Sequence, residues 1–75
     1  MTKYCIAVSP SRFCVAYRFV YATEYSQVDG SIMAWFTTNP DEALIIDGEN
    51  EARRLLHELQ VRYPLTDFMV WDIKE

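Results

Sequence analysis

The sequence predicts an α+β fold: an antiparallel sheet of three to five strands with one main amphipathic helix on one face. Several segments alternate their side chains as strands do, and one segment in the second half repeats its apolar residues at helical spacing. Hydrophobic residues make up 51% of the 75 residues, which provides a dense core for so short a chain. We therefore expect a single domain over residues 1–75, in the order strand, strand, strand, short helical turn, helix, strand.

The first half of the chain predicts three strands, at residues 3–8, 12–23 and 31–37. Each strand alternates two sets of side chains, which lie on opposite faces of a sheet. Turn residues separate the strands: Ser9-Pro10-Ser11 comes before the second strand, and Asp29-Gly30, a strong hairpin signal, comes before the third. Consecutive antiparallel hairpins are therefore expected.

The second strand has two unlike faces. One face is large and aromatic, and its members are Phe13, Val15, Tyr17, Phe19 and Tyr21. The other face is mostly small, and its members are Cys14, Ala16, Arg18, Val20 and Ala22. Because small residues let a helix approach closely, we expect the helix on the second face. The aromatic face then needs another cover, which is a second copy, a target protein or a strong curl of the sheet.

The second half begins with a short helical turn. Asn39 is suited to cap it, Pro40 to its first position, and Glu42 lies three residues after the cap. A short extended piece is expected to follow, because the next apolar residues end in the β-branched pair Ile45-Ile46. Asp47-Gly48 ends that piece.

The main helix is predicted over residues 49–62, and a final strand over residues 67–73. The helix carries one apolar stripe, which consists of Ala52, Leu55, Leu56, Leu59 and Tyr63. Acidic residues at its start and Arg62 at its end match the helix dipole, and Pro64 stops it. His57 lies away from the stripe and is expected to be exposed.

Catalytic and metal-binding patterns are missing from the sequence. His57 is the only histidine, and the two glycines, Gly30 and Gly48, form no phosphate loop. No His, Cys or carboxylate groups have metal-ligand spacing. We therefore expect no enzyme, no metal and no cofactor. Cys5 and Cys14 are expected on one face of adjacent strands, where free thiols are favoured over a disulfide.

The charge of the chain limits its partners. Eleven acidic against seven basic residues give a net charge of −4, which disfavours direct nucleic-acid binding. No apolar run is long enough to cross a membrane, and the N-terminus has no extended apolar signal region, so a cytoplasmic location is expected. Acidic residues gather in the second half, where they form a solvated surface or face a basic partner. They are Asp41, Glu42, Asp47, Glu49, Glu51, Asp67, Asp72 and Glu75.

Two segments carry a resemblance to known proteins. Residues 35–43 (Trp-Phe-Thr-Thr-Asn-Pro-Asp-Glu-Ala) and 51–56 (Glu-Ala-Arg-Arg-Leu-Leu) resemble small accessory proteins of bacteriophages and prophages. The resemblance covers roughly the second half of the chain. It implies a strand-rich domain with one main helix. Several such phage proteins resemble inhibitors of host defence complexes, including anti-CRISPR proteins, which act by binding rather than catalysis.

These observations lead to a hypothesis of function. The protein is expected to be a non-enzymatic, phage-type inhibitor that binds a defence complex in the cytoplasm of a bacterial host. The expected partner-binding residues are Tyr17, Phe19, Tyr21, Asp41 and Glu42. The alternative is a homodimeric regulatory or structural module, in which the aromatic face meets a second copy.

Overall fold

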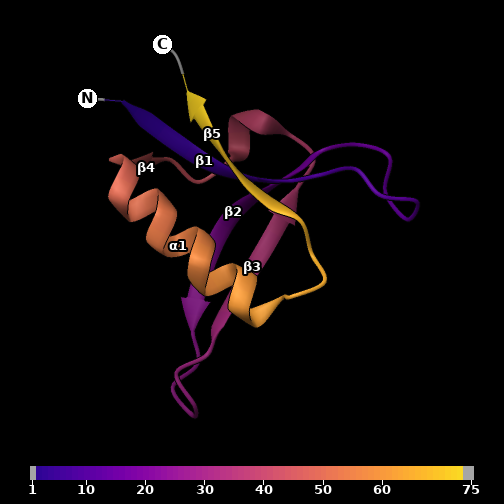
Figure 1. Ribbon diagram of the computed structural model, residues 1–75. Coiled ribbons are helices and arrows are strands. Elements are labelled where there is room, and N and C mark those ends of the chain that lie inside the picture. Colours follow the sequence, from indigo (N-terminus) through magenta and orange to yellow (C-terminus); the bar gives the residue numbers. More distant parts are fainter. Residues whose placement is uncertain (1, 74–75) are drawn as a thin grey trace.

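The computed structural model describes residues 2–73, and within them it contains five strands, one short 3-10 helix and one α-helix (Figure 1). In chain order these are β1 (Lys3–Val8), β2 (Arg18–Tyr25), β3 (Ile32–Thr37), η1 (Pro40–Glu42), β4 (Ile46–Asp47), α1 (Glu49–Arg62) and β5 (Phe68–Ile73). The predicted α+β class and order of elements are confirmed. Strand β4 is the short extended piece expected before Gly48.

Strand β1 lies at the centre of the antiparallel sheet. It pairs with β5 along its whole length, from Lys3 opposite Ile73 to Val8 opposite Phe68. Its other edge is shared, because β2 pairs with its last two residues and β4 with its first two. Among the described residues strand β3 pairs with β2 alone, so β3 and β5 are the outer strands.

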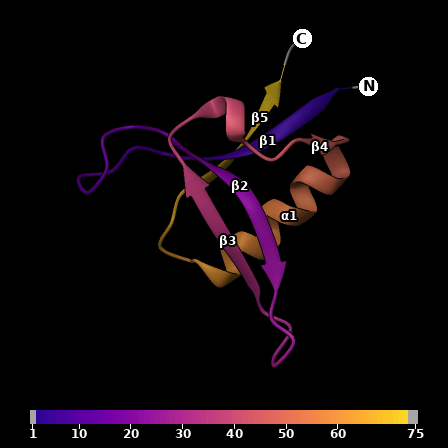
Figure 2. The same cartoon turned by 180° about the vertical axis from the view of Figure 1, so that it is seen from behind.

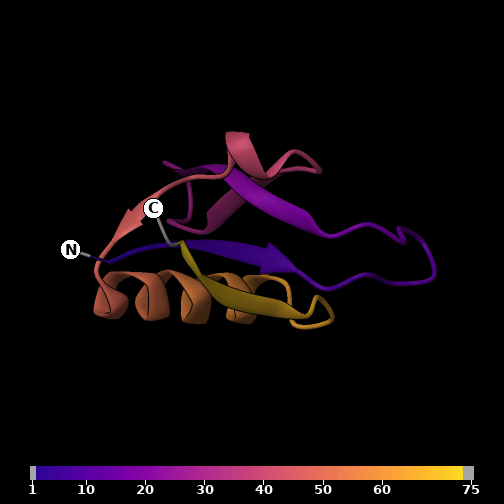
Figure 3. The same ribbon diagram turned by 90° about the horizontal axis from the view of Figure 1, so that it is seen from above.

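The sheet is strongly curled, because β2 turns away from β1 after a short contact. Beyond that contact the backbone N–H of Leu44 donates to the carbonyl of Val20, at 2.9 Å, so the segment before β4 continues along β2. Helix α1 lies on one side of β1 and η1 on the other (Figure 3). Seen from behind, β2 and β3 lie in front of α1 (Figure 2).

The main core lies between the sheet and α1. Its buried members come from all five strands and the helix, and they are Ile6, Val8, Val20, Ile32, Ile46, Ala52, Leu59 and Phe68. The helix therefore covers the face of β2 that carries Val20, as predicted. Its apolar stripe also meets the core as predicted, although Leu55 and Leu56 are half-buried whereas Leu59 is fully buried.

A smaller core lies on the opposite face of the sheet. Its buried members are Cys5, Ala7, Phe19 and Ala43, and Met69, Trp71 and Ile73 pack against them. Ala43 directly follows η1, so this short helix covers part of the face that α1 leaves open. The face of β2 that carries Phe19 is thus covered in part by the chain itself.

The second strand is shorter at its start than predicted. It begins at Arg18 rather than at residue 12, and residues 9–17 form a loop. Pro10 has no N–H for a sheet. Ser11 and Cys14 then exchange two backbone hydrogen bonds, of 2.8 and 3.2 Å, which close a tight turn. Cys14 is therefore in a loop, and its predicted place opposite Cys5 in adjacent strands is wrong.

A β-bulge between Val20 and Ala22 corrects a second prediction. Val20 pairs with Phe36, but Ala22 pairs with Trp35, so β2 contains one residue more than β3 at this point. An extra residue inverts the alternation of side chains beyond it. Ala22 consequently shares the face of Trp35, whereas the sequence predicts Ala22 on the face of Val20.

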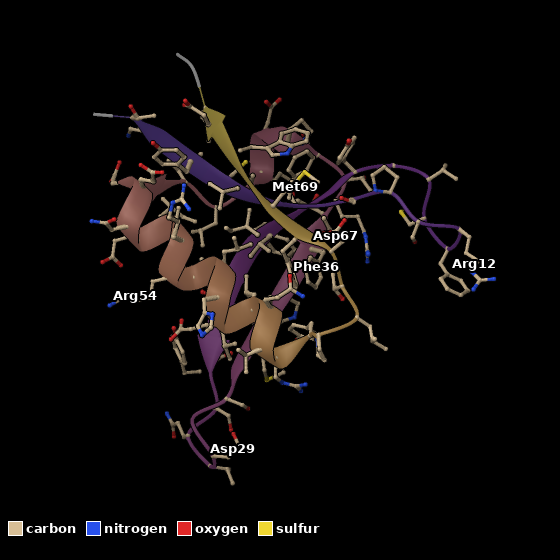
Figure 4. The ribbon with its side chains drawn as sticks, viewed as in Figure 1. Arg12, Asp29, Phe36, Arg54, Asp67 and Met69 are labelled. Atoms are coloured by element: carbon tan, nitrogen blue, oxygen red, sulfur yellow. The ribbon has the colours of Figure 1, made fainter. Side chains whose placement is uncertain are left out.

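Two glycines hold backbone conformations that other residues avoid. Gly30 has φ +72° in the turn between β2 and β3, where its N–H donates to the carbonyl of Ser26 at 2.9 Å. Gly48 has φ +91° immediately before α1. Both turns predicted from glycine are therefore present, and Asp29 lies at the tip of the first (Figure 4).

Candidate protein-interaction surface

An aromatic platform forms on the side of the sheet away from α1. The indole of Trp71 on β5 packs edge-on against two rings, that of Phe19 at 5.2 Å and that of Tyr17 at 5.0 Å between centroids. Such edge-to-face pairs are favourable beyond the area they bury. Phe19 is only 4% exposed, so it forms the base on which Trp71 and Tyr17 rest.

The platform's side of the sheet continues onto β3. Thr37 lies opposite Phe19, so the alternation of β3 places Trp35 and Met33 on the same side, and the bulge brings Ala22 to that side as well. Tyr21 lies within the bulge and is 41% exposed. We call the set of accessible side chains on this side the aromatic face. It consists of Tyr17, Tyr21, Met33, Trp35 and Trp71.

Two carboxylates lie at the border of the aromatic face. Asp41 and Glu42 belong to η1 and are exposed, and the next residue, Ala43, packs in the cluster of Phe19. Asn39 holds this turn together: its Oδ1 accepts from the N–H of Asp41 at 3.0 Å, and its Nδ2 donates to Glu42 at 3.1 Å. This is the cap predicted from the sequence. It holds the backbone of the turn from which both acidic side chains extend.

The five residues predicted to bind a partner occupy three different environments. Tyr17, at 42% exposed, and Tyr21 are accessible on the aromatic face. Asp41 and Glu42 are accessible beside it. Phe19 is buried, so it supports the face from below and offers no direct contact. Sequence reasoning omitted Trp35, Met33 and Trp71 from the set. The alternation of β3 and β5 was the available signal for them.

A second exposed apolar group lies at the tip of the loop before β2. Phe13 is 90% exposed and Val15 is also exposed. Arg12 lies over the ring of Phe13, at 5.5 Å from its centroid, and the tip projects far from the sheet (Figure 4). Phe13 and Val15 are therefore separate from the aromatic face, although the sequence places them on it.

An open groove of about 460 Å³ lies between the β2–β3 turn and the second half of α1. Across it the hydroxyl of Tyr25 donates to the carboxylate of Glu58 at 2.6 Å, and this hydrogen bond raises the pKa of Tyr25. His57 is exposed at its rim, as predicted. The carboxylate of Glu58 is already hydrogen-bonded to Tyr25. The groove is therefore a weaker candidate for a binding site than the aromatic face.

Cysteine and metal chemistry add no further site to the described part of the chain. Both cysteines are free, and burial raises the pKa of the Cys5 thiol. Within residues 2–73, no three His, Cys, Asp or Glu side chains come together as a metal ion requires. In the same span, neither helix has the length and apolar character needed to cross a membrane.

The chain was also compared with known proteins. No family model matches it, and neither a curated protein nor a solved structure matches it.

Proposed function

We propose that this protein works by binding another protein through its aromatic face, and that the partner is a bacterial defence complex which this binding inhibits. The observation that carries the proposal is the accessible group of Tyr17, Tyr21, Met33 and Trp35 on one side of the sheet. Large apolar side chains that are accessible together on one side of a small domain are typical of a binding site. Tyrosine and tryptophan are enriched in such sites, because each buries a large area and keeps one polar atom for a hydrogen bond.

The support beneath the face favours binding over simple exposure. The ring of Tyr17 packs against Trp71, and Trp71 packs against the buried ring of Phe19. These rings are held before any partner arrives. A surface that is ordered in advance loses less side-chain entropy on binding, which raises affinity.

The charge of the surface supports a basic partner. The chain has a net charge of −4, and Asp41 and Glu42 are exposed at the border of the aromatic face. Proteins that hold nucleic acid present lysine and arginine to its phosphates. An arginine gains twice from such a surface, since it pairs with carboxylates and stacks on tyrosine or tryptophan rings. The nucleic-acid channel of a defence nuclease fits this description, and the resemblance to phage proteins points the same way.

The test is a plating assay. The protein is produced in a panel of bacterial strains, each carrying one nuclease-based defence system, and each strain is challenged with a phage that its system restricts. We expect plating to be restored in one strain and unchanged in a matched strain without a defence system. Folded protein that restores plating in no strain of the panel would contradict the defence role.

A further inference from the structure

Strand β3 has an open outer edge. It pairs with β2 on one side, and within residues 2–73 no strand lies on its other side. In the same span, the backbone groups of Ile32, Ala34 and Phe36 make no hydrogen bond to any loop or side chain. Helix α1 packs on the face of this strand that carries Ile32, Ala34 and Phe36.

The pairing with β2 tells which backbone groups point outward. The N–H of Ser26 donates to the carbonyl of Ser31 at 2.8 Å, so this pair is hydrogen-bonded. Bonded and non-bonded pairs alternate along antiparallel strands. The backbone groups of Met33 and Trp35 therefore face β2, whereas those of Ile32, Ala34 and Phe36 face away from it.

Nothing in β3 prevents another strand from pairing there. Proteins protect an open edge with charges, proline or a bulge on the edge strand. The six residues of β3, Ile-Met-Ala-Trp-Phe-Thr, contain neither charge nor proline, and the bulge of this hairpin is on β2. The opposite outer strand, β5, carries the exposed charge of Asp72.

We propose that two copies of this chain pair antiparallel through their β3 edges, with a two-fold axis at Ala34. The segment 31–37 is chemically symmetric about that residue: one apolar pair and one polar residue flank it on each side. A two-fold interface requires such self-complementarity. In this register Met33 lies opposite the partner's Trp35, a favourable sulfur–aromatic pair, and Ile32 lies opposite the partner's Phe36.

This pairing goes beyond the proposed function and has a consequence for it. A two-fold axis perpendicular to the sheet keeps both α1 helices on one side and both aromatic faces on the other. The two faces then form one continuous surface of twice the length. Both aromatic faces of a dimer could then bind one two-fold symmetric or extended partner at the same time.

Ala34→Pro tests the edge directly. The N–H of Ala34 points outward, so proline in both copies removes the two bonds of the central Ala34 pair and none of the bonds to β2. We expect the wild type to sediment as a dimer and Ala34→Pro as a folded monomer, with half the mass. In the wild type, hydrogen exchange at the N–H of Ala34 should be slow and should become fast on dilution.

A charge pair serves as a second test and does not depend on how the fold accepts proline. Met33 and Trp35 are both exposed, so charged side chains there are tolerated by the monomer. The double variant Met33→Lys/Trp35→Lys should be monomeric, as should Met33→Glu/Trp35→Glu. Mixed in equal amounts, the two should form a dimer, since each lysine then faces a glutamate.

The outcomes separate clearly. A wild type that is monomeric at every concentration, a folded Ala34→Pro variant that is still a dimer, or a mixture of charge variants that stays monomeric would each overturn the proposal. These experiments measure mass and amide exchange only. Their failure would leave the proposed binding of another protein untouched.

Discussion

Trp71 of β5 and Phe19 of β2 meet edge to face, with ring centroids 5.2 Å apart, although β1 lies between their strands. The contact crosses the sheet on the side away from α1, above the small residues Cys5 and Ala7 of β1. Small side chains on the central strand let two large rings from the flanking strands touch. This contact organises the second face of the sheet.

The first prediction concerns the base of the aromatic face. Phe19→Ala should lower the free energy of unfolding by about 3–5 kcal/mol, because it empties a buried site. Tyr17→Ala should cost only about 1–2 kcal/mol, because that ring is 42% exposed and loses mainly its contact with Trp71. Urea unfolding measures both. Equal costs for the two variants would contradict the assigned burial.

The second prediction concerns α1. Leu59→Ala should destabilise the protein by about 2–5 kcal/mol, whereas the half-buried Leu55 should cost less when truncated. His57→Ala should be nearly silent, because His57 is exposed. Thermal unfolding of the three variants gives the ranking. If His57→Ala were the most destabilising, the orientation of the helix would be wrong.

Thiol reactivity provides the third prediction. Cys5 is buried and its pKa is raised, so it should stay protonated and inaccessible at neutral pH. Cys14 is only partly covered and lies in a loop. A thiol reagent should modify one cysteine per folded chain and both after unfolding. The melting temperature should be the same with and without reductant, since neither thiol is in a disulfide; a drop on reduction would contradict free thiols.

The fourth prediction is a titration. The hydrogen bond to Glu58 raises the pKa of Tyr25 above the ordinary value of about 10. A raised folded-state pKa means that the hydrogen bond stabilises the fold at pH values below the unfolded pKa. That stabilisation is lost as the pH rises through the folded pKa. The phenol of Tyr25 should therefore ionise above its ordinary pKa of about 10 in an NMR titration of isotope-labelled tyrosines.

Glu58→Gln supplies the control for that titration. It removes the negative charge, so the pKa of Tyr25 should fall towards the ordinary range. Glu49→Gln changes the same charge at the other end of α1, where Glu49 pairs with Arg53, and should leave Tyr25 unchanged. An equal effect of the two substitutions would mean that net charge alone, rather than the hydrogen bond, controls the phenol.

Much of the fold follows from local sequence signals. The stripe of α1 predicts the helix and its orientation, because helical spacing gathers Ala52, Leu59 and Tyr63 on one side. Asn39 predicts the turn of η1, because its side chain can accept a hydrogen bond from the backbone at the start of a helix. Gly30 predicts the hairpin turn, because glycine readily adopts a positive φ. The alternation of β1, β3 and β5 also predicts which of their side chains share a face of the sheet.

The errors lie where alternation continues but the strand does not. Residues 13–17 alternate as regularly as the strand that follows, so the pattern gives no sign of the turn closed by Ser11 and Cys14. The bulge at Val20–Ala22 contains no glycine to mark it. Both features depend on tertiary pairing: the turn takes Phe13 and Val15 away from the aromatic face, and the bulge moves Ala22 to that side of the sheet. The alternation of β5 gives the side of Trp71 but not its contacts with Tyr17 and Phe19, because these join strands that only the folded sheet brings together.

The central claim is that the aromatic face binds the partner, and one comparison tests it most directly. Tyr21→Asp places a charge on that face, whereas Leu65→Asp makes a similar change at a fully exposed position in the turn after α1. In the strain where the wild type restores phage plating, we predict that Leu65→Asp restores it equally. Tyr21→Asp should fail to do so while keeping the wild-type circular dichroism spectrum. Full activity of a folded Tyr21→Asp variant would contradict the claim.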